Sequence, residues 1–110
     1  MKMAALRTLL RVPASARPGE VMEVRLLMQH PMETGFRPDA GGRTVPRNIL
    51  RRIEARFEGE LVFAADLFPA ITANPYIAFP LRATRSGTLT VTIEGDNGLA
   101  ERETAVITVA

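Results

Sequence analysis

Apolar and polar residues alternate along much of the chain, which is the pattern of a strand with one buried face. The clearest case runs from Glu20 to Gln29, where every second residue is apolar: Met22, Val24, Leu26 and Met28. A shorter segment from Leu6 to Val12 alternates in the same way and stops at Pro13. Both segments are predicted to be strands, separated by a turn at Pro18-Gly19.

The last third of the chain repeats this alternation. Threonines alternate with apolar residues from Thr88 to Ile93, and the pattern returns from Ala105 to Val109. Between them, Gly95-Asp96-Asn97-Gly98 has the composition of a hairpin turn, because Asn and Gly tolerate positive φ. Two strands joined by this turn are therefore predicted.

The segment 48–57 fits two interpretations. Ile49, Ile53 and Phe57 recur every four residues, and the run between them has a high helix propensity. The same residues also fit one face of a strand, and the β-rich context favours the strand.

Two further strands are predicted at Leu61–Ala65 and Tyr76–Ala83. The second contains Pro80, which has no backbone N–H to donate to a neighbouring strand. Tyr76–Ala83 is therefore expected at a sheet edge or with a bulge.

Seven strands with turn signals between them indicate an all-β protein, an antiparallel immunoglobulin-like β-sandwich. The chain has 110 residues, 46% of them hydrophobic and 24% charged, which suits a single globular domain over residues 1–110. Cysteine and tryptophan are absent from the sequence. Antibody domains are stabilised by a conserved pair of cysteines and a tryptophan, so we expect this chain to share their sandwich architecture without belonging to them.

The segment from His30 to Pro46 has no periodicity. It contains six residues that interrupt regular structure: Pro31, Gly35, Pro38, Gly41, Gly42 and Pro46. A connection of this length in a compact domain tends to be functional, so a binding surface is expected here.

Composition excludes most catalytic chemistry. Without cysteine there is no disulfide, no thiol nucleophile and no thiolate metal site, and a single histidine makes an imidazole zinc site untenable. The serines, Ser15 and Ser86, do not lie in a nucleophile-elbow pattern, and the sequence has no phosphate-binding glycine loop. No catalytic residue, metal ligand or cofactor is therefore predicted. An enzyme with a carboxylate site remains an alternative, although the dispersed carboxylates single out no pair.

His30 has three interpretations. It precedes Pro31, which favours an extended backbone, so it could end a strand and bond to a loop carbonyl. It could instead contact a partner or an anion from a recognition loop, or ligate a metal.

The charge is concentrated in the middle of the chain. The net charge is only +2, which gives little support to nucleic-acid binding. Segment 36–57, however, holds six arginines against two acidic residues. This segment could form an anion- or protein-binding surface, or simply a solvated strand face.

The connections also contain apolar residues that the strands do not explain, at Met32, Phe36 and Leu67–Ile71. Such residues cover the core or meet a partner.

No apolar stretch reaches the ~18 residues of a membrane-spanning helix. Arg7 interrupts the apolar run near the N-terminus, so these features alone predict a cytoplasmic protein.

Several motifs resemble the SoxZ family in order and spacing. They are His-Pro-Met-Glu-Thr-Gly at 30–35, Pro-Arg at 46–47, Ala-Asp-Leu at 65–67, Pro-Ala-Ile at 69–71 and Ala-Asn-Pro-Tyr at 73–76. SoxZ is the small subunit of the SoxYZ sulfur carrier in bacterial thiosulfate oxidation. Pro80 departs from what this resemblance leads us to expect in that strand.

The resemblance implies an immunoglobulin-like sandwich that forms a hetero-oligomer with SoxY. In that family, SoxY carries the sulfur intermediates on the cysteine of a C-terminal Gly-Gly-Cys-Gly-Gly arm, and SoxZ is not an enzyme. Contact with the other Sox enzymes is transient. SoxZ-like chains reach the periplasm bound to a SoxY with a twin-arginine signal, so the resemblance replaces the cytoplasmic expectation by a periplasmic one.

A partner interface is expected at the His30–Gly35 loop, at Arg47 and along the Leu67–Tyr76 connection. The candidate residues are His30, Met32, Arg47, Phe68 and Tyr76. Phe68 and Tyr76 are the expected anchors, because aromatic side chains supply much of the binding energy of protein interfaces.

Overall fold

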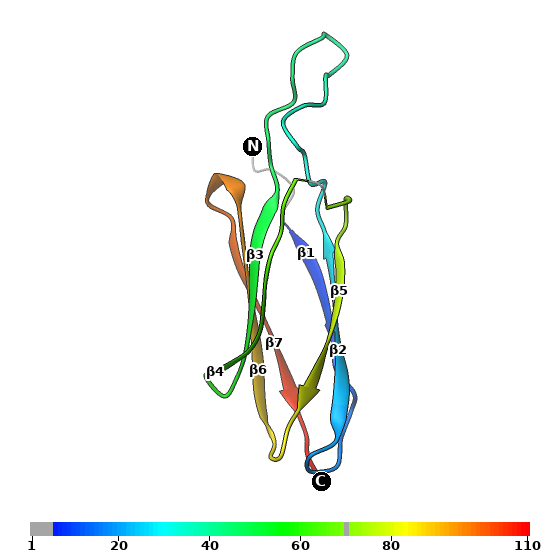
Figure 1. The fold of residues 1–110 in the computed structure, drawn as a ribbon, viewed down its shortest axis with the longest axis vertical. Helices are drawn as coiled ribbons and strands as arrows, with labels where there is room; N and C mark the ends of the chain where they lie inside the picture. The colour runs from blue at the N-terminus through cyan, green and yellow to red at the C-terminus, as the bar shows by residue number, and fades with distance from the viewer. Residues whose placement is uncertain (1–5, 70) are drawn as a thin grey trace.

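A computed structural model describes residues 6–69 and 71–110 of the chain (Figure 1). Seven strands lie in this part of the chain: β1 (Arg7–Arg11), β2 (Val21–Gln29), β3 (Leu50–Phe57), β4 (Glu60–Asp66), β5 (Tyr76–Arg82), β6 (Gly87–Gly95) and β7 (Ala100–Ile107). A short 3-10 helix, η1 (Asp96–Gly98), joins the last two strands. Residues 1–5 lie outside the described residues, and so does Ala70, which belongs to the apolar connection and to the Pro-Ala-Ile motif named above.

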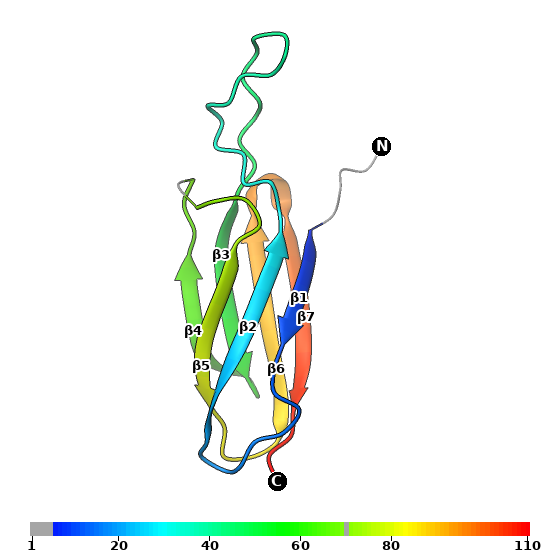
Figure 2. The same cartoon turned by 90° about the vertical axis from the view of Figure 1, so that its right-hand side faces the viewer.

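The strands form two antiparallel sheets packed face to face (Figures 1 and 2). One sheet has the order β1-β2-β5 and the other the order β4-β3-β6-β7. Every neighbouring pair is antiparallel. The predicted all-β antiparallel sandwich is confirmed.

The core consists of the inward faces of both sheets, and the predicted alternation holds on each. The inward residues of β2 and β6 are almost inaccessible to solvent: Met22, Val24, Leu26, Met28, Leu89, Val91 and Ile93. Each such side chain contributes about 1.5–3 kcal/mol relative to exposure. Between the edge strands β4 and β5, the rings of Phe63 and Phe79 stack at 4.3 Å and link the two sheets.

The ambiguous segment 48–57 is a strand from Leu50 to Phe57, as its context predicted, whereas Asn48 and Ile49 precede the strand. β3 lies between β4 and β6 and pairs with both, so hydrogen bonds to two neighbours satisfy its backbone. Ile53 and Ala55 are fully buried against the core. Tertiary pairing therefore outweighs the local helix propensity of the arginine-rich run.

Pro80 lies in an edge strand. β5 has a single neighbour, β2, and Pro80 pairs opposite Glu23 without a shift of register. Of the two expected alternatives, the edge position is therefore correct and the bulge is not. In an edge strand, a residue without an N–H can leave the pairing regular.

The last strand begins earlier than predicted. The alternation placed it at Ala105–Val109, whereas β7 spans Ala100–Ile107. Its first half contains Glu101, Arg102 and Glu103 and buries nothing, so no apolar pattern marks it. Pairing with β6 along eight residues imposes the extended conformation.

The aperiodic segment forms a narrow projection, residues 31–48, which we call the arm. It extends beyond one end of the sandwich (Figure 1), and the molecule measures 57 × 27 × 20 Å. Its two legs are joined at the base by a reciprocal pair of backbone hydrogen bonds between Glu33 and Asn48, both 2.8 Å long. Farther out, Val45 N–H donates to the Arg37 carbonyl at 2.7 Å. The arm is thus an irregular hairpin.

Gly95 permits a close approach between the end of β6 and the residues that follow the arm. A Cβ at position 95 would lie 2.9 Å from the carbonyl oxygen of Ile49 and 3.1 Å from the Leu99 side chain. Gly95→Ala is therefore expected to destabilise the protein by about 1–3 kcal/mol through overpacking. Urea denaturation measures this loss, and Gly41→Ala is the control, because its nearest contact is 3.5 Å away. Equal stabilities of the two variants would contradict the steric argument.

Candidate functional site

Asp96 connects the arm to the turn between β6 and β7. Its carboxylate accepts two hydrogen bonds from the Arg47 guanidinium, from Nε at 2.8 Å and from Nη2 at 2.9 Å. It also accepts the backbone N–H of Ile49 at 3.1 Å, and Arg51 Nε lies 3.4 Å away. These hydrogen bonds, led by those of Arg47, lower the pKa of Asp96 below its usual 3.8. The carboxylate therefore holds the returning leg of the arm against the sandwich.

His30 connects the end of β2 to the β4–β5 connection. Its backbone N–H donates to Asn74 Oδ1 at 2.9 Å, and the Asn74 N–H donates to its carbonyl at 2.8 Å. The imidazole is buried, and its Nδ1 accepts the backbone N–H of Met32 at 3.0 Å. Of the three interpretations, the structure matches the strand-end residue, except that the imidazole bonds to an N–H and not to a carbonyl.

Met32 shapes the first turn of the arm from inside. Its backbone is left-handed, with φ of 52°, a conformation that costs energy in any residue with a side chain. The side chain is buried, and its sulfur accepts the Leu50 N–H at 3.3 Å. Together with the hydrogen bond that the Met32 N–H donates to His30 Nδ1, these contacts hold the strained turn in place.

The neutral form of His30 stabilises the fold, which predicts a pH dependence. Burial lowers the pKa of His30 below 6.5, although a hydrogen bond with Asn48 and the charge of Asp96 act in the opposite direction. As the pH falls below 6.5, the unfolded chain binds a proton before the folded protein does. The free energy of unfolding should therefore decrease between a pH of about 7.5 and about 5.5.

Urea denaturation at these two pH values measures the dependence. His30→Gln keeps a hydrogen-bond acceptor but does not titrate, so its stability should change less over the same interval. An equal pH dependence in both proteins would show that His30 does not cause it.

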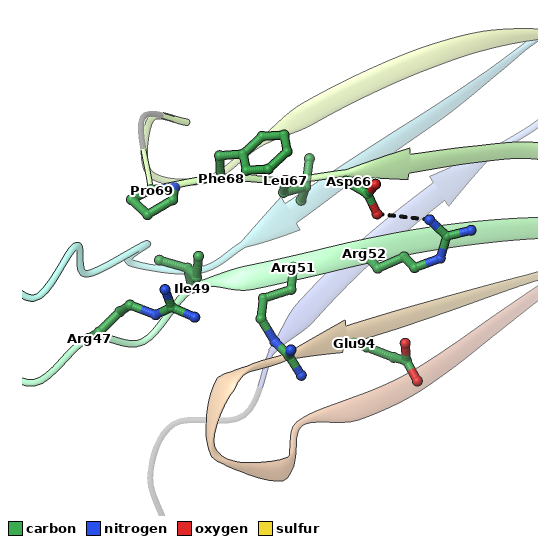
Figure 3. Close-up of a pocket in the computed structure, with 9 residues that line it drawn as sticks. All are labelled: Arg47, Ile49, Arg51, Arg52, Asp66, Leu67, Phe68, Pro69 and Glu94. Atoms are coloured by element: carbon green, nitrogen blue, oxygen red, sulfur yellow. Dashed lines mark hydrogen bonds and ion pairs between the residues drawn. The ribbon is translucent and has the colours of Figure 1, made fainter.

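Beside the base of the arm is a groove of about 350 Å³ (Figure 3). Ile49 and Leu67 are buried beneath it, whereas Phe68 is 62% exposed at its rim. The other lining residues are Arg47, Arg51, Arg52, Asp66, Pro69 and Glu94. The groove combines an apolar side with guanidinium groups, which suits a protein segment better than a small anion.

Carboxylates balance most of the arginines of segment 36–57. Arg52 lies 2.8 Å from Asp66 and 2.9 Å from Glu54, and Arg56 lies 3.4 Å from Glu54. Arg37 pairs with Glu33, and Arg47 and Arg51 share Asp96. Several of these carboxylates come from other parts of the sequence, so the charge counted along the segment exceeds the charge on the surface.

The five predicted interface residues fall into two groups. Arg47 is exposed, and Phe68 and Tyr76 are 62% and 59% exposed. His30 and Met32 are buried, with 6% and 4% exposure, so they support the arm and present no side chain to a partner. His30 follows β2 and Phe68 lies two residues beyond β4, whereas Tyr76 begins β5. These strand ends lie at the end of the sandwich from which the arm, with Met32 and Arg47, projects (Figures 1 and 2).

Sequence reasoning missed the role of Asp96. Asp96 lies in the turn Gly95-Asp96-Asn97-Gly98, where an aspartate commonly accepts hydrogen bonds from its own turn. Its partner Arg47 is 49 residues away along the chain. The signal that could have revealed the pair was the excess of arginines in the arm.

The sequence model of the family described as "Sulphur oxidation protein SoxZ" matches residues 10–106. The chain belongs to the SoxZ family. This membership places the protein in the Sox sulfur oxidation system, and it confirms the resemblance seen in the motifs. No curated protein sequence matches the chain.

Solved structures show the same fold. The sulfur carrier protein SoxY from Chlorobium limicola f thiosulfatophilum aligns with a TM-score of 0.67 and 16% identity, covering 94% of this chain and 78% of that chain. A superoxide reductase (neelaredoxin) from Ignicoccus hospitalis aligns with a TM-score of 0.71 and 20% identity, covering 94% of this chain and 80% of the reductase. At these identities the likeness concerns the fold alone.

The described residues contain no group of three or more histidine, cysteine, aspartate or glutamate side chains placed to hold a metal ion. Among the same residues, no helix has the length and apolar character needed to cross a membrane.

Proposed function

We propose that this SoxZ-family chain is a non-catalytic subunit of a sulfur carrier complex in thiosulfate oxidation. Its partner is a SoxY-like protein whose C-terminal Gly-Gly-Cys-Gly-Gly arm carries the sulfur intermediates. The family match over residues 10–106 is the observation that carries this proposal. The composition supports it, because a chain without cysteine has no thiol to which sulfur could be attached.

The proposed interface lies at the arm end of the sandwich. Phe68 and Tyr76 supply exposed aromatic surface, and Arg47 lies beside the groove that Phe68 borders. Apolar side chains in connections, left uncovered by the rest of the chain, are typical of protein contacts. His30 and Met32 contribute by holding the arm in its conformation.

The complex is proposed to act in the periplasm, where the partner presents its sulfur-carrying arm to the other Sox enzymes in transient contacts. The chain would be exported together with a SoxY-like protein that bears the twin-arginine signal. This part of the proposal rests on the family. A net charge of +2 gives no reason to include nucleic acid among the partners.

Native mass spectrometry tests the proposal. The chain is analysed alone and after co-expression with a SoxY-like protein that has the cysteine-containing arm. A complex at the summed mass, with sulfur adducts on the partner's cysteine alone, is expected. Two results would contradict the proposal: an uncomplexed chain beside a cognate partner, or turnover of a sulfur substrate by the isolated chain.

A second candidate function is an anion- or protein-binding module that uses segment 36–57. Arg43 supports it, because this side chain makes no ion pair within residues 6–69 and 71–110. Association through such arginines should slow steeply as salt is added. An association rate independent of salt would exclude this candidate.

A further inference from the structure

The outer face of the three-stranded sheet carries an apolar row that crosses all three strands. Leu9 of β1 pairs opposite Leu27 of β2, which pairs opposite Tyr76 of β5. Leu9 is 45% exposed and Tyr76 is 59% exposed. Figure 2 looks onto this face, with β2 between β5 and β1. Farther along the same face, Val21 is 53% exposed. The row therefore leaves a continuous strip of apolar surface in solvent.

Around this row the face is strongly basic. Its exposed charged residues are Arg7, Arg11, Arg25, Arg82 and Glu23. Four arginines against one glutamate give this face a net charge of +3, more than the +2 of the whole chain. Only Arg25 has a partner within the described part of the chain, Glu23 at 2.7 Å.

Two of these arginines lie directly opposite each other. Arg11 of β1 and Arg25 of β2 are register partners in neighbouring strands. Like charges in such a position destabilise a sheet. A carboxylate supplied from outside would reduce this repulsion, whereas Glu23, the only carboxylate that the described residues place on this face, already pairs with Arg25.

The outer face of the four-stranded sheet provides the contrast. Several of its charged residues pair among themselves, as Arg52 does with Glu54 and Asp66, and Arg56 with Glu54. Threonines fill much of its centre: Thr90, Thr92 and Thr104. Leu61 and Val106 are exposed on this face, but they lie on its two edge strands, β4 and β7, with two strands between them. The row of apolar residues on neighbouring strands is therefore a property of the three-stranded face.

We propose that the outer face of the β1-β2-β5 sheet docks the partner subunit, through a partner surface that has an apolar centre with carboxylates around it. This inference rests on the proposed function, since it takes the SoxY-like protein as the occupant. Charge complementarity selects the chemistry of that surface. A second copy of this chain does not fit, because two such faces in contact would bring eight arginines together against two glutamates.

The test compares single variants on the two outer faces. Leu9→Ser removes part of the apolar row, and its control is Val106→Ser, which removes a 70% exposed side chain from the opposite face. Arg11→Glu reverses one charge of the Arg11–Arg25 pair. Its control is Arg102→Glu, at an exposed arginine of β7. The affinity of each variant for the co-expressed SoxY-like protein is measured by titration calorimetry. Thermal unfolding confirms that each variant is folded.

Leu9→Ser and Arg11→Glu should each weaken binding by about ten-fold or more, and the two controls by less than about two-fold. The Arg11→Glu effect should shrink as salt is added, because salt screens the charges. If all four variants bind as tightly as the unchanged chain, the β1-β2-β5 face is not the docking surface, while the proposed function stands. If the unchanged chain binds no SoxY-like protein, the proposed function itself fails. Self-association of the chain that Leu9→Ser abolishes would assign the face to a second copy and overturn the inference.

Discussion

Replacing Asp96 by alanine is expected to lower the free energy of unfolding by about 2–3 kcal/mol and to loosen the base of the arm. The main cause is the backbone N–H of buried Ile49, which loses its acceptor at 3.1 Å. The variant also loses the two hydrogen bonds that hold Arg47. Urea denaturation measures the stability, and hydrogen exchange of residues 31–48 measures the mobility of the arm.

Asp96→Asn is the matched variant for this test. It keeps an oxygen that can accept the Ile49 N–H but removes the charge, so a smaller loss of stability is expected. The pH dependence separates the two effects. Because the pKa of Asp96 is lowered in the folded protein, its stabilisation is complete above 3.8 and is lost as the pH falls below that value. Asp96→Asn should lack this part of the acid sensitivity, and an unchanged acid transition would exclude Asp96 as its source.

Replacing Phe68 or Tyr76 by serine is expected to weaken binding of the SoxY-like partner by about 30-fold for each substitution. Both rings are more than half exposed, so their truncation removes binding surface without opening the core. Each lies where the chain leaves or enters a strand at the arm end of the sandwich (Figure 1). Calorimetric titration against the partner measures the loss.

Leu61→Ser is the control for the aromatic substitutions. Leu61 is 46% exposed on β4, the strand that leads to Phe68, but lies near its opposite end. Its replacement should leave the affinity within about two-fold. Met32 is unsuitable for this comparison, because a serine at that buried position would also change stability. If Phe68→Ser and Tyr76→Ser bind like Leu61→Ser, the arm end of the sandwich is not the interface.

The strands were predictable wherever one face is buried. In β2 and β6 every inward residue is apolar, and the period of two is visible in the sequence. The pattern failed for the first half of β7, where Glu101, Arg102 and Glu103 bury nothing. It was ambiguous for β3, because its apolar residues satisfy the helical and the extended spacing alike. There, hydrogen bonding with two neighbouring strands decided the conformation.

The candidate site was only partly predictable. The absence of periodicity indicated the arm, and the exposure of Phe68 and Tyr76 agrees with their proposed role. For Met32 the sequence left two alternatives open, covering the core or meeting a partner, and the structure buries it at a residue with a left-handed backbone. The excess of arginines in the sequence indicated that carboxylate partners were needed, but not that Asp96, from a different connection, would be the partner of Arg47.

Local information in the sequence thus determined the strand pattern, the turn chemistry, the family and the lack of a thiol that could carry sulfur. Only the tertiary structure decided which charges cancel and which remain. Ion pairs depend on distance in space, so Asp66 and Asp96 neutralise arginines that the sequence displays as a basic cluster. Strand register, likewise, aligned Leu9, Leu27 and Tyr76 from three separate segments into one exposed row. Neither result can be obtained from neighbours along the chain, because both arise from pairing between residues distant in sequence.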